Sequence, residues 1–111
     1  MYRTKDELKE LLIPSNSTLR DAVKAMDNAH LGIISIVDEE NHFLGIFTDG
    51  DFRNSILQGI DLSTSILKVI NENPIVIDKK NANANKIKNC LNENSIFQLP
   101  IIDNNLPFFR L

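Results

Sequence analysis

Cysteine, histidine and long apolar runs are scarce in this sequence, and each scarcity excludes a class of protein. The 111 residues contain one cysteine, Cys90, so no disulfide can form within the chain. No apolar run is long enough to cross a bilayer, and the N-terminal residues MYRTKDELKE contain no apolar signal-peptide region. We therefore expect a cytoplasmic protein without a membrane partner, in which Cys90 is an inert thiol on the inner side of a helix.

Positive charge is not in excess either. The net charge is -3 and the pI is about 5.3, so nucleic acid is not an expected partner. The histidines, His30 and His42, have no second ligand at metal-binding spacing, and no residue is placed to activate a nucleophile. A glycine-rich phosphate loop is also lacking. These absences predict a chain that is not itself an enzyme and that requires no metal or cofactor.

The sequence does contain an internal repeat. Residues 12–38 align with residues 77–103, which brings Leu12 onto Ile77 and Met26 onto Leu91. Each copy begins with a short apolar strand, continues with a helix of period 3.6 and reaches a second strand that ends in aspartate, Asp38 or Asp103. A third strand at residues 43–47 and a helix beginning near Asp49 complete the first copy.

This pattern predicts an α+β fold of two β-α-β-β-α repeats, over residues 1–62 and 63–111. Each repeat is too small to bury both sides of its sheet alone, so we expect the two to pack together. The second copy stops at residues 106–111, about where the first reaches Thr48, and is therefore incomplete. We expect the chain to be a fragment of a longer protein.

The stretch GIFTDGDFR, residues 45–53, joins the third strand of the first copy to its last helix. Thr48 is expected at the helix N-cap and Asp51 three residues later, which is the spacing of a capping box. Under the simplest interpretation, these residues only accept hydrogen bonds from the unpaired backbone N–H groups at the start of the helix.

A binding function is the alternative. Gly50 permits close approach to the backbone, and a helix N-terminus attracts phosphate. Two carboxylates in one turn would repel a bare phosphate, so Asp51 is expected to accept hydrogen bonds from the vicinal hydroxyls of a ribose. Thr48 and the helix amides would meet the phosphate, while Arg53 offsets the charge of Asp49. These residues predict a phosphorylated nucleoside as ligand.

The same residues resemble a known family. GIFTDGDFR, following the strand Ile36-Val37-Asp38, resembles the signature end of a CBS domain, and the repeat resembles the tandem pair called a Bateman module. The stretches LLIPSNSTLRDAV, HLGIISIVDEENHFLGIFTDGDFR and QLPIIDNN resemble the CBS pair that precedes sugar-phosphate nucleotidyltransferases of the mannose-1-phosphate guanylyltransferase kind. The CBS pair of arabinose-5-phosphate isomerases also carries a stretch like GIFTDGD.

The resemblance implies a ligand and its site. In CBS pairs that bind AMP, ADP or ATP, the aspartate of T-x-x-D holds the ribose and the threonine lies by the phosphate. The base would lie between two segments of this chain, one at Leu12, Ile13 and Pro14 and the other at Gly32 and Ile33. The second copy has no T-x-x-D, so only one of the two ligand sites that are usual in a CBS pair can be recognised in this sequence.

Two functions remain open at this point. In the first, the chain is a regulatory nucleotide sensor that acts on an attached catalytic domain. In the second, the chain is a structural module in which the apolar helix faces around Phe52, Ile56, Leu57 and Leu67 form a homodimer and the T-D-G-D turn only caps a helix.

Overall fold

The computed structural model describes residues 11–78, 80, 82–93, 99–103 and 106–110. The first unit contains β1 (Leu12–Pro14), α2 (Leu19–Ala29), β2 (Ile33–Val37), β3 (Phe43–Thr48) and α3 (Asp49–Leu57). A short 3-10 helix, η1 (Ile66–Lys68), follows. The second unit contains β4 (Ile77–Asp78), α4 (Ala84–Glu93), β5 (Leu99–Asp103) and β6 (Leu106–Arg110). The predicted α+β fold is therefore confirmed, while residues 1–10 and 111 of the expected repeats lie outside the described residues.

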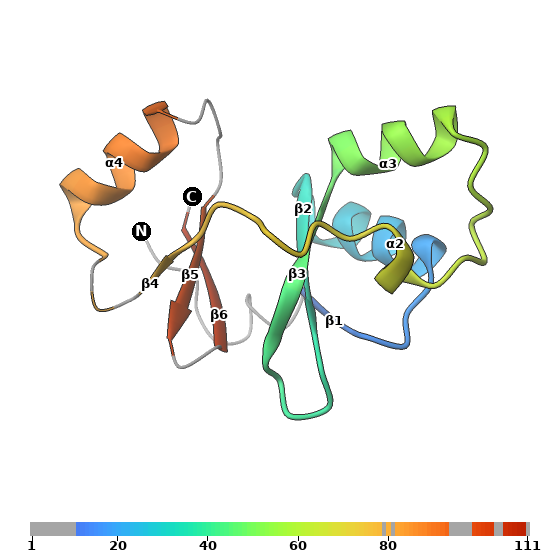
Figure 1. Ribbon diagram of the computed structural model, residues 1–111, viewed down its shortest axis with the longest axis horizontal. Helices are drawn as coiled ribbons and strands as arrows, with labels where there is room; N and C mark the ends of the chain where they lie inside the picture. The colour runs from blue at the N-terminus through green and yellow to red at the C-terminus, as the bar shows by residue number, and fades with distance from the viewer. Residues whose placement is uncertain (1–10, 79, 81, 94–98, 104–105, 111) are drawn as a thin grey trace.

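The two sheets have the same topology. In the first, β1 pairs with β2 in parallel and β2 pairs with β3 antiparallel, and β4, β5 and β6 repeat this arrangement. Figure 1 shows the two sheets next to each other in the middle of the molecule, with α4 on one side and α2 and α3 on the other. The repeat seen in the sequence is thus a repeat of three-dimensional units.

The core of the first unit lies between its sheet and α2. Leu19, Ala22 and Met26 face inward at the spacing of one helix face. All five residues of β2 are buried, so this strand is covered on both sides. Burying a large aliphatic or aromatic side chain contributes about 1.5–3 kcal/mol, so the central strand is a main source of stability. The complete buried apolar cluster consists of Leu11, Ile13, Leu19, Ala22, Met26, Ile33, Ile34, Ile36, Ile46, Phe47 and Ile66.

The segment after α3 wraps around the first unit. Backbone hydrogen bonds join Arg20 N to Leu62 O at 3.0 Å and Ile66 N to Ser17 O at 2.9 Å. Further on, Asn71 exchanges two backbone hydrogen bonds with Ile46 on the edge of β3, at 2.9 and 3.1 Å. The expected division after residue 62 falls inside this wrapping segment, whose residues up to Asn71 are attached to the first unit.

The helix α3 differs from its expected amphipathic pattern. Phe52 packs against the core, but Leu57 is 85% exposed and Ile56 is 49% exposed. The buried residue of this helix is instead Ser55, whose hydroxyl donates to the carbonyl of Asp51 at 2.8 Å. The apolar stripe is thus narrower than the sequence suggests, because α3 turns its Ser55 edge toward the rest of the unit.

The second unit has a smaller described core. Ile87 is buried in α4, and Cys90 is half-buried next to it rather than enclosed. The asparagine-rich turn supplies the expected cap, since Asn83 Oδ1 accepts from Lys86 N at 2.9 Å. Among the helices formed by the described residues, none is long and apolar enough to span a membrane.

Candidate functional site

The turn from β3 to α3 is a complete capping box. Thr48 is the N-cap with an extended backbone, and its hydroxyl accepts from Asp51 N at 3.2 Å. In return, Asp51 Oδ2 accepts from Thr48 N and from the Thr48 hydroxyl, each at 3.0 Å. The capping role predicted for both residues is confirmed.

A second capping box provides an internal comparison. At the start of α2, Asp21 N donates to the Thr18 hydroxyl at 3.2 Å, and Thr18 N donates to Asp21 Oδ2 at 2.9 Å. The backbone geometry matches that of Thr48 and Asp51, although no ligand is expected at α2. The cap at α3 is therefore no evidence for binding by itself, and the evidence must come from what surrounds Asp51.

The carboxylate of Asp51 is only half used by the cap. All of its hydrogen bonds end on Oδ2, and no residue in the described part of the chain donates to Oδ1. The side chain is partly exposed. Asp51 therefore keeps one oxygen for a donor from another molecule while it caps its own helix.

The other predicted site residues of this turn lie as follows. Thr48 pairs with Ile33 in the sheet register, and Asp49 N donates to Gly32 O at 3.1 Å. The Asp49 carboxylate occupies the space that a Cβ on Gly32 would fill. The structure thus brings Gly32, Ile33, Thr48 and Asp49 together at one end of the sheet, and the missing side chain of Gly32 makes room for Asp49.

The predicted base-binding strand lies further along the sheet. Leu12 pairs with Ser35 and Pro14 with Val37, which are two and four residues beyond Ile33 on β2. At about 3.3 Å per residue, these positions are roughly 7 to 13 Å from the Thr48 end of the strand. Ile13 is buried in the core. One ligand that contacts both Asp51 and Leu12 or Pro14 must therefore span this distance.

Gly50 and Arg53 lie close to each other in the first turns of α3. Residues two apart on an α-helix point in nearly opposite directions, so Arg53 does not face Asp51. A Cβ on Gly50 would be 3.9 Å from Arg53 Nη2 and 3.7 Å from the Thr48 hydroxyl, which are ordinary contacts. The Arg53 side chain thus reaches back toward the N-terminal turn of α3.

A pocket opens on the Asp51 side of α3. Its volume is about 230 Å³, and it lies between α3 and the wrapping segment. The lining residues are Asp51, Asn54, Ser55, Gln58, Ile60, Lys68, Val69 and Ile70. Of these, sequence reasoning identified only Asp51.

Some of the pocket residues that the sequence analysis did not identify could have been predicted from helical spacing, and others could not. Asn54, Ser55 and Gln58 follow Asp51 at the i+3, i+4 and i+7 positions, so helical spacing alone puts them on the same face. Lys68 carries no such signal, because it reaches the pocket only through the wrapping of the segment after α3.

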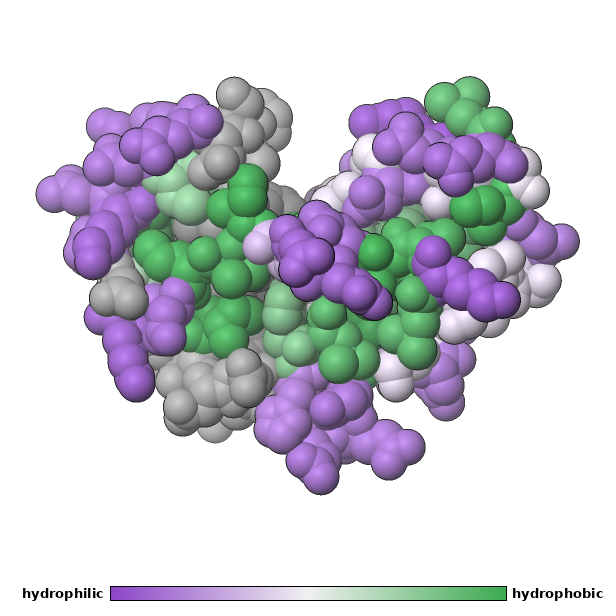
Figure 2. Space-filling view, viewed as in Figure 1, coloured by the Kyte–Doolittle hydropathy of each residue, from purple (hydrophilic) through white to green (hydrophobic). Residues whose placement is uncertain are grey.

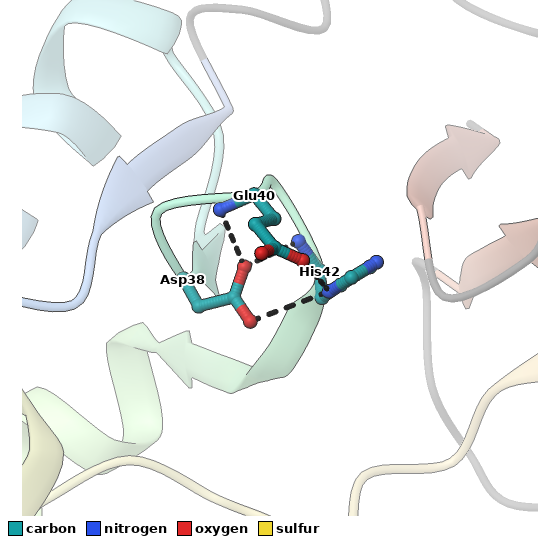
Figure 3. A network of polar contacts seen from close by, with 3 residues as sticks. All are labelled: Asp38, Glu40 and His42. Carbon is teal, nitrogen blue, oxygen red and sulfur yellow. Dashed lines mark hydrogen bonds and ion pairs between the residues drawn. The ribbon is translucent and has the colours of Figure 1, made fainter.

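A separate polar cluster shapes the hairpin between β2 and β3 (Figure 3). Asp38 Oδ1 accepts from the backbone N–H groups of Glu40 and His42 at 2.9 and 2.8 Å. The hydrogen bond from His42 N is the main cause that lowers the pKa of Asp38. His42 Nδ1 lies 3.4 Å from Asp38 Oδ2 and 3.5 Å from Glu40 Oε2. In the part of the chain that the structure describes, no group of three ligating side chains could hold a metal ion.

The segment that contains the turn from β3 to α3 also matches a family of known proteins. The family model described as the CBS domain matches residues 7–58. This segment of the chain is therefore similar to a CBS domain. Its match ends at Gln58, so it includes the Thr48 to Asp51 turn and the whole of α3.

Solved structures of CBS-domain proteins share the fold of both units. A CBS domain protein from Pyrobaculum aerophilum complexed with AMP has a TM-score of 0.75 and 13% identity, over 87% of this chain and 74% of that one. The CBS domain pair of protein MJ0100, in complex with 5'-methylthioadenosine and S-adenosyl-L-methionine, has a TM-score of 0.72 and 20% identity, over 86% and 73%. At these identities the likeness concerns the fold alone.

A curated relative of known activity is the arabinose 5-phosphate isomerase GutQ of Salmonella typhi. It is 26% identical over 105 residues, which are 95% of this chain and 32% of that protein. The chain thus spans about a third of the length of the curated relatives it matches.

Proposed function

We propose that this chain is a regulatory module that binds an adenosine-type nucleotide and thereby modulates an attached catalytic domain. One observation carries the proposal: Asp51, in the segment that matches the CBS domain, keeps a carboxylate oxygen that its helix cap does not use, and it lines a pocket. The AMP and S-adenosyl-L-methionine complexes of two proteins with this fold support the ligand class.

The binding mode follows from the capping box. Asp51 Oδ1 accepts one hydroxyl of a ribose while Oδ2 continues to hold Thr48 N. A donor on the ligand can also take over the place of the Thr48 hydroxyl, which then becomes available to an anion. Binding thus changes the hydrogen bonds of the cap without dismantling the helix.

The attached domain is proposed to act on a sugar phosphate. The sequence resemblance suggests a nucleotidyltransferase of the mannose-1-phosphate guanylyltransferase kind. The match to GutQ over 95% of this chain favours the alternative, an arabinose-5-phosphate isomerase. Ligand control of either enzyme requires that the nucleotide bind one arrangement of the protein more tightly than another.

A structural role is the second candidate. Exposed apolar side chains occur on α3 and at separate places along the segment that follows it, at Ile56, Leu57, Leu67, Ile75 and Val76. Figure 2 shows apolar surface over this part of the molecule, interrupted by polar side chains. A homodimer formed through these residues would cover the exposed apolar surface.

Thermal melting with a panel of nucleotides tests the proposed function. The panel contains AMP, ADP, ATP, S-adenosyl-L-methionine, a GDP-sugar and a CMP-sugar. A ligand at 100 times its dissociation constant adds about 2.7 kcal/mol, which raises the melting temperature of a domain of this size by roughly 10 °C or more. We expect this rise with an adenosine ligand. No rise with any member of the panel would leave the structural role as the better account.

A further inference from the structure

The side chains expected to meet a phosphate, Thr48 and Arg53, do not line the pocket beside Asp51. The hydrogen of the Thr48 hydroxyl is donated to Asp51 Oδ2 at 3.0 Å. Arg53 is not among the lining residues, and its Nη2 lies beside Gly50. An anion bound next to the ribose therefore needs a different positive group.

Lys68 is the cation that lines this pocket. Lys68 is the last residue of the short helix η1. The first residue of this helix, Ile66, is fully buried and donates its N–H to Ser17 O at 2.9 Å. Lys68 N donates to Ser65 O at 3.1 Å. The backbone that carries Lys68 is thus held to the core of the first unit, while the flexible side chain can place its ammonium group in the pocket.

The lining of the pocket has three chemical parts. Asp51 Oδ1 accepts hydrogen bonds, and the amides of Asn54 and Gln58 both donate and accept. Lys68 attracts an anion. Ile60, Val69 and Ile70 contribute apolar surface. The Ser55 hydroxyl is already used, since it donates to Asp51 O.

These parts select the ligand by exclusion. A simple anion without hydroxyl groups would face the Asp51 carboxylate and be repelled. A neutral sugar would leave the Lys68 ammonium unpaired. A molecule with neighbouring hydroxyl groups and a phosphate satisfies both. The volume of about 230 Å³ lies below the 300–1,000 Å³ that is typical of sites for drug-sized ligands, so it suits a sugar phosphate better than a whole nucleotide.

We propose that the pocket between α3 and the wrapping segment binds a polyol phosphate, with Lys68 as the residue that meets the phosphate and Asp51 as the residue that meets the hydroxyls. The inference rests on the proposed function, because Asp51 belongs to both sites. The polyol phosphate is either a free sugar phosphate or the ribose phosphate of a nucleotide, whose base then extends out of the pocket.

Isothermal titration calorimetry with three probes tests the inference: AMP, ribose 5-phosphate and adenosine. Lys68→Gln removes the positive charge at the pocket. Lys88→Gln is the matched control, because Lys88 is an exposed lysine on α4 in the other unit. We expect Lys68→Gln to weaken AMP binding roughly tenfold or more, on the scale of one charge-assisted hydrogen bond, and to leave adenosine binding unchanged. Lys88→Gln should bind every probe as the wild type does.

The outcomes separate this inference from the proposed function. If the wild type binds AMP and Lys68→Gln binds it equally well, or loses adenosine to the same extent, the role of Lys68 is wrong and the nucleotide sensor stands. If the wild type binds none of the probes, this inference fails, and the thermal-melting panel decides the proposed function separately. Ribose 5-phosphate that binds as tightly as AMP identifies a free sugar phosphate as the ligand. Binding of AMP alone, with its dependence on Lys68, identifies the nucleotide.

Discussion

Two buried serines of the first unit differ in whether the hydroxyl has a hydrogen-bond partner. This difference predicts opposite effects on stability when each serine is replaced by alanine. Ser35 lies in the middle of β2 with 0% exposure, and its hydroxyl is the one described buried side-chain group without a hydrogen-bond partner. Ser55 is also buried, but its hydroxyl donates to Asp51 O. An unsatisfied buried hydroxyl costs about 1–3 kcal/mol.

Ser35→Ala should therefore raise the melting temperature, whereas Ser55→Ala should lower it slightly. Both changes remove one oxygen from a buried site, so each serves as the control for the other. Thermal unfolding followed by circular dichroism measures the two shifts. A destabilised Ser35→Ala variant would mean that the hydroxyl has a partner in solution.

Three aspartates of the first unit predict how its stability depends on pH. The pKa values of Asp21, Asp38 and Asp61 are lowered from 3.8, mainly by backbone N–H donors at Thr18, His42 and Ser63. A carboxyl group with a lowered pKa in the folded state stabilises the fold above its unfolded pKa, and this stabilisation is lost as the pH falls through the folded pKa.

The melting temperature should consequently fall as the pH drops below about 4. Asp38→Asn should reduce the slope of this fall, because the amide cannot titrate. Asp27→Asn, which makes the same charge change on α2, is the control. Melting curves between pH 6 and pH 2 supply the test, and equal slopes for the wild type and Asp38→Asn would contradict this account.

At the scale of elements, the wrapping segment is attached to β3 at a glycine. A Cβ on Gly45 would collide with the backbone carbonyl of Asn71, which makes one of the two hydrogen bonds to Ile46. A Cβ on Gly32 would instead meet the carboxylate of Asp49, an exposed side chain that can rotate away. The same substitution should thus have different costs at the two positions.

Gly45→Ala should destabilise the protein by about 1–3 kcal/mol, since the backbone must shift and two hydrogen bonds weaken. Gly32→Ala should cost less. Hydrogen exchange at the Ile46 and Asn71 amides should also accelerate in Gly45→Ala only. Equal protection of these amides in both variants would show that the attachment does not depend on Gly45.

The element scale also shows what could be predicted from the sequence. The caps at Thr18, Thr48 and Asn83 are local patterns, and all three are present in the structure. The repeat predicted two equivalent sheets. It did not predict the register of the strands. Leu12 pairs with Ser35, so its equivalent Ile77 would be expected to pair with Pro100, but Ile77 pairs with Ile101, one residue further along. Such a shift depends on packing between strands, which an alignment of the two copies does not contain.

The pocket was beyond prediction for a similar reason. Lys68 and Ile70 line the same pocket as Asp51 because the segment after α3 returns to the first unit. Backbone hydrogen bonds to Ser17 and Ile46 hold it there. These are contacts between distant parts of the chain. In contrast, the half-used carboxylate of Asp51 follows from a local capping pattern that the sequence does show.

At the scale of the whole molecule, the exposed end of α3 predicts self-association. Leu57 is 85% exposed, so Leu57→Lys should change the stability of a single chain by less than about 0.5 kcal/mol. If the proposed homodimer forms through this surface, the same change should shift the protein toward monomer. Light scattering after size-exclusion chromatography measures the mass. A dimer that survives Leu57→Lys would place the contact elsewhere.

The position of the pocket bears on the regulation proposed above. The pocket is bounded by α3 of the first unit and by the segment that continues into β4 of the second. Because Lys68 is itself attached to the first unit, a ligand that bridges Asp51 and Lys68 would hold the start of this connection in place, and an effect on the second unit would have to pass along the residues beyond Asn71.

The central claim is that Asp51 binds a ligand in addition to capping its helix, and AMP affinity in two matched variants tests it most directly. Asp51→Asn and Asp21→Asn alter equivalent capping boxes and should each lower the melting temperature modestly. Calorimetric titration should show that Asp21→Asn binds AMP like the wild type, while Asp51→Asn binds it at least roughly tenfold more weakly. Equal AMP affinities for the two variants would contradict the claim and leave Asp51 as a helix cap alone.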